Sequence, residues 1–308
     1  MSATTKTTDT TPTDTTAAET PATETTAGAT AAGATAAGAT AEAMEATEAT
    51  DAATEAPADA SGLGTAITTA YSDALASVYD DIYPGTDEIA EYLTTIAEPG
   101  ASVLELGVGT GRVALPLVEH GFRVHGVETS EGMLAKLAEK DPQGRVTPVL
   151  GDLVQLDLGR TFDVVLAPFN VMCCAMTIDE QIAMMHAIAR NTAPDGRVVI
   201  ETFDPSDYHV QRKADITTRP AGTRGVVIES LEVLPASQNM LLNSTLFLDG
   251  EAPKSSSTVM RYLWPSELDL LAAIARLELV GRYAGWQEQP FDGGDSRKMC
   301  VSVFRPLA

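Results

Sequence analysis

Strand-like and helix-like segments alternate along residues 102–203, and this alternation constrains the fold more than any other feature of the chain. The expected strands are 102–106, 122–127, 145–151, 162–169 and 196–203, and the expected helices between them are 110–120, 130–140 and 178–192. Such alternation predicts a parallel sheet covered by helices on both faces. Two further helices, 72–83 and 86–97, precede the first strand. We therefore expect a doubly wound α/β fold.

The alternation stops after the fifth strand. Residues 205–262 hold several β-like runs and no clear helix, which predicts an antiparallel β insert between strand 5 and the last helix, expected over 266–278. Strands over 279–286 and 298–304 follow. This closing helix and pair of strands suggest that the last strand runs antiparallel to the rest of the sheet.

The first part of the chain has a different composition. Residues 1–62 contain no aromatic residue and no Ile, Val or Leu, so they cannot bury enough apolar surface to offset their chain entropy. We predict a disordered, low-complexity acidic tail rich in Thr and Ala over 1–65 and a single domain over 66–308. The tail holds one lysine against ten acids, and the whole chain carries a formal charge of −23.

The charge and the apolar pattern exclude several classes of partner. The net field of so acidic a chain repels a phosphate backbone, so we expect no nucleic-acid partner. No apolar run reaches membrane-spanning length, and the N-terminus has neither the basic start nor the apolar core of a secretory signal. We therefore expect a cytoplasmic protein without a membrane partner. The sequence is compatible with a homodimer.

Three glycines occupy alternate positions directly after the first expected strand: Gly107, Gly109 and Gly111. Glycine permits positive φ and lets a ligand approach the main chain closely. In a doubly wound sheet, ligands bind beyond the carboxyl ends of the strands, where this loop is expected to lie. A simple tight turn has the same pattern, so the glycines alone leave both interpretations open.

Carboxylates at three consecutive strand ends favour a ligand site: Glu105, Glu128 and Asp152. Glu128 can accept hydrogen bonds from both hydroxyls of a ribose. The alternative is that Glu128 is a solvated acid at a helix start, with Thr129 or Ser130 as the helix cap. Asp152 could accept from an adenine amine. The third glycine comes one residue earlier than in the dinucleotide-binding GxGxxG pattern. Glu105 beside the loop suits an ammonium or sulfonium and opposes a pyrophosphate, which favours S-adenosylmethionine over NAD.

These segments resemble the motifs of class I S-adenosylmethionine-dependent methyltransferases. VLELGVGTGRVALPL resembles their motif I, VETSEGML their second motif, and the GD pair at 151–152 their adenine-contacting step. The resemblance covers residues 70–308 and implies a Rossmann-like seven-stranded methyltransferase sheet with S-adenosyl-L-methionine as cofactor. It implies that the cofactor is bound by Tyr79, Glu105, Gly107, Gly109, Gly111, Arg112, Glu128, Thr129, Met133, Gly151, Asp152, Leu153, Pro168 and Asn170.

The motif YDDIY (79–83) is similar to the YDxxY of small-molecule methyltransferases, including aminosugar N-methyltransferases. In those enzymes the second tyrosine lies over the cofactor and the reacting centre, a catalytic role that would fall to Tyr83. His209 is the other predicted catalytic residue, as a base, with Asp204 and Tyr208 as further candidates. A surface loop position is the alternative for His209. Where some aminosugar enzymes place a histidine after the fourth strand, this chain has the residues NVMC at 170–173.

The predicted function is methylation of a nitrogen or oxygen of a small-molecule acceptor by direct displacement. In such a reaction the protein mainly aligns the reactants and excludes water. The insert 205–262 is expected to form the wall or lid over the acceptor. A NAD-dependent oxidoreductase and a non-catalytic S-adenosylmethionine-binding module are the alternatives. The cysteines and histidines show no metal-ligand spacing, so no metal site is predicted.

Overall fold

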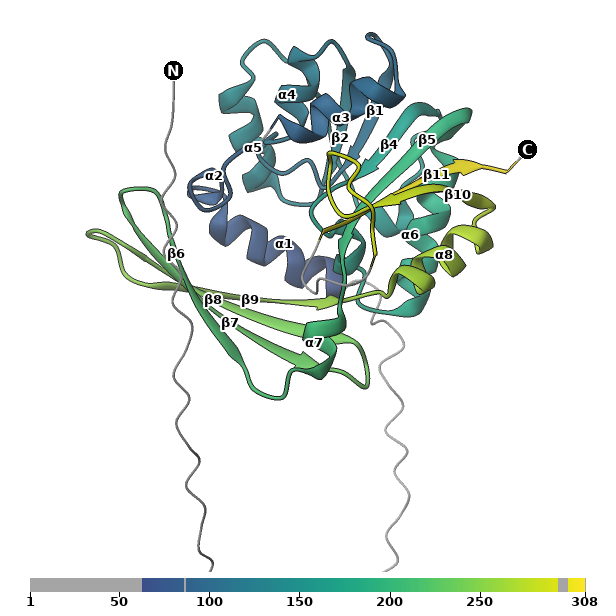
Figure 1. Cartoon of the computed structure of the whole chain (residues 1–308). Helices are drawn as coiled ribbons and strands as arrows, with labels where there is room; N and C mark the ends of the chain where they lie inside the picture. The colour runs from purple at the N-terminus through teal and green to yellow at the C-terminus, as the bar shows by residue number, and fades with distance from the viewer. Residues whose placement is uncertain (1–62, 86, 293–298, 308) are drawn as a thin grey trace, which may run out of the picture. The chain divides into compact units, whose positions relative to one another are not determined.

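A computed structural model describes residues 63–85, 87–292 and 299–307 (Figure 1). The predicted acidic tail therefore lies almost wholly outside the described residues. The main sheet contains the strands β1 (Ser102–Leu106), β2 (Arg123–Glu128), β3 (Thr147–Leu150), β4 (Phe162–Ala167), β5 (Thr192–Phe203), β10 (Leu277–Tyr283) and β11 (Met299–Pro306). Their order is β10-β11-β5-β4-β1-β2-β3. β1 to β5 pair in parallel, whereas β11 is antiparallel to β5 and to β10. The seven-stranded, doubly wound sheet is thus confirmed, with its antiparallel last strand.

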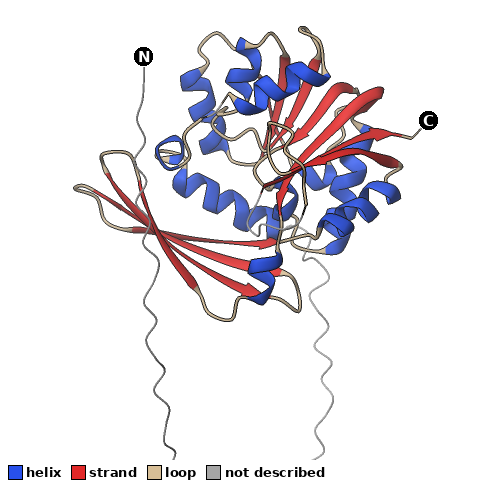
Figure 2. Ribbon diagram, viewed as in Figure 1, coloured by secondary structure: helices blue, strands red, loops and turns tan. Residues whose placement is uncertain are grey.

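Helices cover both faces of this sheet (Figure 2). The described helices are α1 (Leu63–Leu75), α2 (Tyr79–Ile82), α3 (Glu88–Ile96), α4 (Ala114–Glu119), α5 (Glu131–Lys140), α6 (Ile178–Arg190), α7 (Ser206–Val210) and α8 (Pro265–Ile274). α3, α4 and α5 pack on one face and α6 and α8 on the other. In β4, Val164 packs in the core under α3, α4 and α5, and Val165 packs in the core under α6 and α8. Successive side chains of a strand point to opposite faces of the sheet.

Three helices differ from their predicted bounds by more than two residues. The helix expected over 266–278 spans Pro265–Ile274, since β10 already begins at Leu277. The helix expected over 72–83 is divided into α1 and α2, and α1 begins at Leu63, before the predicted domain boundary at residue 66. The helix expected over 110–120 begins only at Ala114. Gly109 and Gly111 precede it with φ of +54° and +81°, a left-handed backbone that no right-handed helix can include.

The predicted insert forms a second, smaller sheet. Its strands are β6 (Asp215–Pro220), β7 (Gly225–Leu234), β8 (Asn239–Leu248) and β9 (Lys254–Arg261), in that order and all antiparallel. Apolar side chains of this sheet, among them Val227 and Leu246, pack against Leu75 and Ile82 of α1 and α2. Figures 1 and 2 show α1 lying between the two sheets. Within the described part of the chain, no helix is long and apolar enough to span a bilayer.

Candidate functional site

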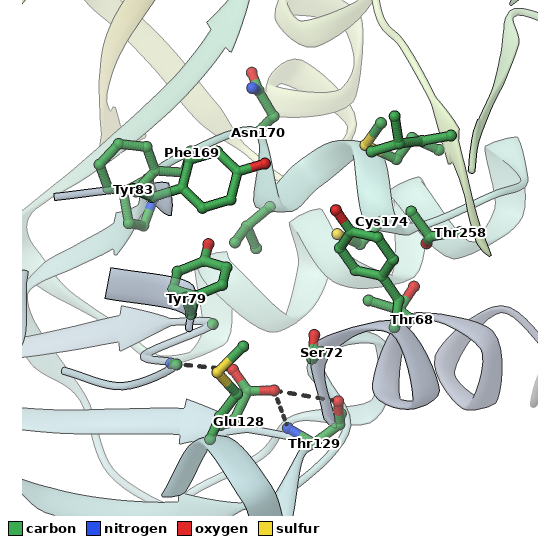
Figure 3. Close-up of a pocket in the computed structure, with 18 of the residues that line it drawn as sticks. Thr68, Ser72, Tyr79, Tyr83, Glu128, Thr129, Phe169, Asn170, Cys174 and Thr258 are labelled. Atoms are coloured by element: carbon green, nitrogen blue, oxygen red, sulfur yellow. Dashed lines mark hydrogen bonds between the residues drawn. The ribbon is translucent and has the colours of Figure 1, made fainter. Parts of the chain in front are cut away.

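A cavity of about 560 Å³ begins at the glycine loop after β1 and extends along the inner face of the second sheet. All four strands of the second sheet contribute to its lining, as do α1 and the end of α2. The following predicted residues line it: Tyr79, Tyr83, Glu105, Gly107, Gly109, Arg112, Glu128, Thr129, Met133, Asp152, Leu153, Pro168 and Asn170. Figure 3 shows a close-up of this cavity, with Tyr79 between Glu128 and Tyr83 in the view.

Two predicted glycines lie beside the cavity rather than in its wall. Gly151 borders a shallower recess that it shares with Thr129 and Asp152. Gly111 has a φ of +81°, and the space where its side chain would be is occupied by Leu137 of α5. Gly111 therefore allows α5 to pack closely against the loop.

The glycine loop approaches its neighbours closely. Gly107 has a φ of +71°, and a Cβ added to it would lie 2.7 Å from Cγ2 of Val171. The loop is tied to the end of β2, because the N–H groups of Gly107 and Val108 both donate to the Val127 carbonyl, at 2.8 and 3.0 Å. Glycine at position 107 thus provides both a left-handed backbone and an empty volume.

Glu128 holds this loop through its carboxylate (Figure 3). Oε2 accepts from the Gly109 N–H at 3.1 Å, and Oε1 accepts from the N–H groups of Thr129 and Ser130 at 2.9 and 3.0 Å. The N-cap of α5 is Ser130 and not Glu128, since Ser130 Oγ accepts from the Met133 N–H. The Thr129 hydroxyl is a further, longer donor to Oε1 of Glu128 at 3.4 Å. A carboxylate offers about four acceptor positions, so Oε2, with its single bond, keeps one position for a ligand hydroxyl at the cavity wall.

Glu105 is a buried carboxyl group with an unused acceptor atom. Its side chain is 2 % exposed, and Oε2 has no hydrogen-bond partner among the described residues. Burial raises the pKa of Glu105 well above its ordinary value, and the nearby Arg112 opposes this shift. Buried polar atoms are rarely left unpaired in proteins, so Oε2 fits a ligand that donates a hydrogen bond.

A strained turn after β4 forms another part of the wall. Phe169 and Asn170 have φ of +49° and +62°, which is unusual for consecutive residues other than glycine. The Phe169 N–H donates to Oε2 of Glu201 at 2.9 Å, and the Arg112 guanidinium lies over the Phe169 ring, 3.6 Å from its centroid. Burial raises the pKa of Glu201 to about 7. Glu201 therefore helps to hold a turn that borders the cavity.

The two tyrosines of the YDDIY motif lie together in the cavity wall. The ring centroids of Tyr79 and Tyr83 are 5.0 Å apart. Burial raises the pKa of Tyr79 to about 12 and that of Tyr83 further. Both hydroxyls are therefore protonated near neutral pH and act as hydrogen-bonding groups rather than as bases.

The structure does not bring His209 to the cavity. Its Nδ1 is 2.7 Å from the hydroxyl of the fully buried Tyr262, and its ring packs edge-on against Trp264. These contacts give no support for a role as base. Of the further candidates, Tyr208 lines the cavity, whereas Asp204 instead accepts a hydrogen bond from the Ser206 N–H at 2.9 Å.

Comparisons with known proteins agree with this arrangement. A family model described as a methyltransferase domain matches residues 103–196. The chain is 31% identical over 225 residues to the cypemycin N-terminal methyltransferase of a Streptomyces species, an alignment that covers 72% of this chain and 90% of that protein. The chain belongs to the class I S-adenosylmethionine-dependent methyltransferases. As an enzyme of this class, the methyltransferase is not the NAD-dependent oxidoreductase that the sequence left as an alternative, and its cofactor is S-adenosylmethionine.

Solved structures resemble this methyltransferase over most of its length. CcbJ, a methyltransferase from Streptomyces caelestis, is 37% identical with a TM-score of 0.71, and the match covers 78% of this chain and 99% of CcbJ. The S-adenosylmethionine-bound amino pentose methyltransferase CalS10 from Micromonospora echinaspora shares the fold, with a TM-score of 0.58 at 21% identity. That match covers 74% of this chain and 94% of CalS10.

The sequence analysis missed several residues that line the cavity of the methyltransferase or hold its wall in place. Glu201 interrupts the apolar run VVIETF, and this lone acid was a signal that could have been used. Tyr71 of α1 and the pair Arg219 and Glu229 carry no local signal. They meet only because the second sheet folds back over α1.

Proposed function

We propose that this methyltransferase methylates an amine nitrogen of a small molecule. The observation that carries the proposal is the chemistry of the tyrosine side of the cavity, where the hydroxyls of Tyr79 and Tyr83 are protonated and no histidine lines the wall within the described residues. A hydroxyl acceptor needs a base to become a good nucleophile, whereas a neutral amine already has a lone pair. The name of the Streptomyces relative, an N-terminal methyltransferase, also supports a nitrogen acceptor.

The cofactor half of the cavity fits S-adenosylmethionine. We expect Glu105 Oε2 to accept from the amino group of the cofactor, Glu128 from its ribose, and Asp152 from its adenine. Gly107 and Gly109 would let it approach the main chain. The unpaired oxygen of Glu105 is the observation that tests this fit, because it requires a donor that the described residues do not supply. When bound, S-adenosylmethionine supplies a methyl group activated by a sulfonium.

The residues of the chain then have two tasks. The hydroxyls of Tyr79 and Tyr83 can hold the acceptor nitrogen by hydrogen bonds, and the inner face of β6–β9 can close the site against water. Holding two reactants in the right orientation can lower a barrier by about 7–11 kcal/mol in favourable cases, so no further catalytic group is required. The second sheet is thus the proposed acceptor wall, and Tyr83 keeps its proposed position at the reacting centre.

The proposal is tested with matched amines and alcohols. The purified enzyme is incubated with methyl-labelled S-adenosylmethionine and pairs of compounds that differ only in an amino or hydroxyl group, and products are detected by mass spectrometry. We expect the amines to gain one methylene in mass and the alcohols to remain unchanged. Methylation of the alcohols alone would contradict the nitrogen assignment. Failure to bind S-adenosylmethionine in calorimetry would contradict the whole function.

A further inference from the structure

The acceptor half of the cavity contains a buried carboxylate that the cofactor half does not use. Glu229 lies on β7, lines the cavity and is 3 % exposed. Its Oε2 is paired with Nε of Arg219 at 2.9 Å. Arg219 is about half exposed at the rim of the wall, so the buried carboxylate is paired with a guanidinium that stays partly hydrated.

The second oxygen of Glu229 has room for a stronger donor. Among the residues that the structure describes, Oε1 receives two long contacts, from the Tyr83 hydroxyl at 3.4 Å and from Ser244 Oγ at 3.4 Å. Hydrogen bonds from a hydroxyl to a carboxylate are usually 2.5–2.7 Å long, so neither contact uses the full capacity of this oxygen. A buried carboxylate oxygen with such long contacts is suited to a strong hydrogen-bond donor such as an ammonium.

Two tyrosine hydroxyls lie next to this oxygen. Ser244 Oγ is 3.5 Å from the Tyr71 hydroxyl and 3.4 Å from Glu229 Oε1, so Tyr71, Tyr83 and Glu229 meet around one point of the cavity. Burial raises the pKa of both tyrosines, which keeps their hydroxyls neutral with lone pairs available. The rings of Tyr79 and Tyr83 lie 5.0 Å apart, and the Arg219 guanidinium lies over the Tyr83 ring, 5.3 Å from its centroid. The Tyr79 ring adds an aromatic face that attracts a cation.

We propose that Glu229, Tyr71 and Tyr83 form a subsite that binds the acceptor as a positively charged amine. The bound ammonium gives a proton to a solvent water before methyl transfer, which leaves the neutral nitrogen with the lone pair that the reaction needs. The proposal rests on the amine acceptor proposed above and assigns the residues that recognise it. An ammonium group has three N–H donors, and the subsite offers one carboxylate oxygen and two hydroxyl oxygens. A neutral alcohol of the same shape has a single O–H donor, so it can satisfy only part of this set.

The test uses cyclohexylamine and cyclohexanol, which have the same shape and differ in charge at neutral pH. Binding of each probe to the full chain, without cofactor, is measured by ligand-observed NMR. We expect wild-type protein to bind cyclohexylamine roughly 10- to 100-fold more tightly, the range expected for a charge-assisted hydrogen bond in a partly buried site. Glu229→Gln should abolish this preference. Glu232→Gln, an equal charge change on the exposed side of β7, should keep it.

Two further measurements separate the outcomes. Thermal unfolding and the affinity for S-adenosylhomocysteine should be the same in Glu229→Gln and wild type, which shows that the variant is folded with an intact cofactor half. Equal binding of the two probes by wild type, or an undiminished preference in Glu229→Gln, would overturn the subsite. Neither result touches the proposed function, which fails instead when wild type binds no S-adenosylmethionine or methylates no amine.

Discussion

Replacing Gly107 by alanine tests the close packing of the glycine loop. The residue has a φ of +71°, and the new Cβ would lie 2.7 Å from Cγ2 of Val171. A left-handed backbone costs a residue other than glycine about 1–2 kcal/mol. Overpacking costs about 1–3 kcal/mol more, and a β-branched valine has few rotamers with which to move away. We therefore expect Gly107→Ala to lower the free energy of unfolding by about 2–5 kcal/mol.

Two companion variants separate the two contributions. Gly144 also has a positive φ, +64°, but a Cβ there would meet no atom within 4 Å. Gly144→Ala should therefore cost only the backbone penalty of about 1–2 kcal/mol. Val171→Ala removes the methyl group that the new Cβ contacts. The double variant Gly107→Ala/Val171→Ala should thus be more stable than the sum of the two single variants predicts.

The measurement is urea unfolding followed by circular dichroism, with the affinity for S-adenosylmethionine determined by calorimetry. Because Gly107 lines the cavity, we expect its variant to bind the cofactor at least about tenfold more weakly, while Gly144→Ala binds it as wild type does. The reasoning is refuted if Gly107→Ala is no less stable than Gly144→Ala. Additivity in the double variant would show that the valine contact carries no strain.

Three further predictions concern the cavity wall. Glu128→Gln loses the charge that holds the Gly109 N–H and should weaken cofactor binding about tenfold or more in calorimetry; unchanged affinity would contradict its role. Burial raises the pKa of Glu201 from 4.5 to about 7, so the folded state binds more protons than the unfolded state between these values. The resulting stability is present below pH 4.5 and falls by up to about 3 kcal/mol as the pH rises to 7. Urea unfolding at a series of pH values should show no such loss of stability for Glu201→Gln. An equal loss of stability with pH in both proteins would contradict the prediction. Leu242→Trp fills the cavity from β8 and should reduce turnover with little change in cofactor affinity. Asn243→Trp, on the exposed side of β8, should leave both turnover and cofactor affinity unchanged. Equal turnover of the two variants would contradict the proposal that the second sheet forms the acceptor wall.

Local signals predicted most of the main sheet. β1 has the predicted bounds, 102–106, because a short apolar run before a glycine loop has few other stable arrangements. The reversal of β11 followed from the order of the last helix and strands. The first expected helix, 72–83, was misplaced, since the sequence pattern did not indicate the break between Leu75 and Tyr79.

Local sequence patterns could not predict the acceptor half of the cavity. Glu229 and Ser244 face each other only through the register of β7 and β8, and Tyr71 joins them from a helix more than 150 residues earlier in the chain. The position of His209 outside the cavity lining could not be predicted for a similar reason. Its partner, the Tyr262 hydroxyl, lies 53 residues later in the chain, and tertiary packing rather than a local sequence pattern brings the two together.

The isolated oxygen of Glu105 has a consequence for how cofactor capture is coupled to protons. In the ligand-free protein, burial favours the neutral acid. If the amino group of S-adenosylmethionine is placed beside it, as we propose, its positive charge favours the ionised form. Binding should then release a proton to the buffer. The heat of binding should accordingly vary with the ionisation enthalpy of that buffer, and cofactor affinity should increase with pH in the range where Glu105 titrates.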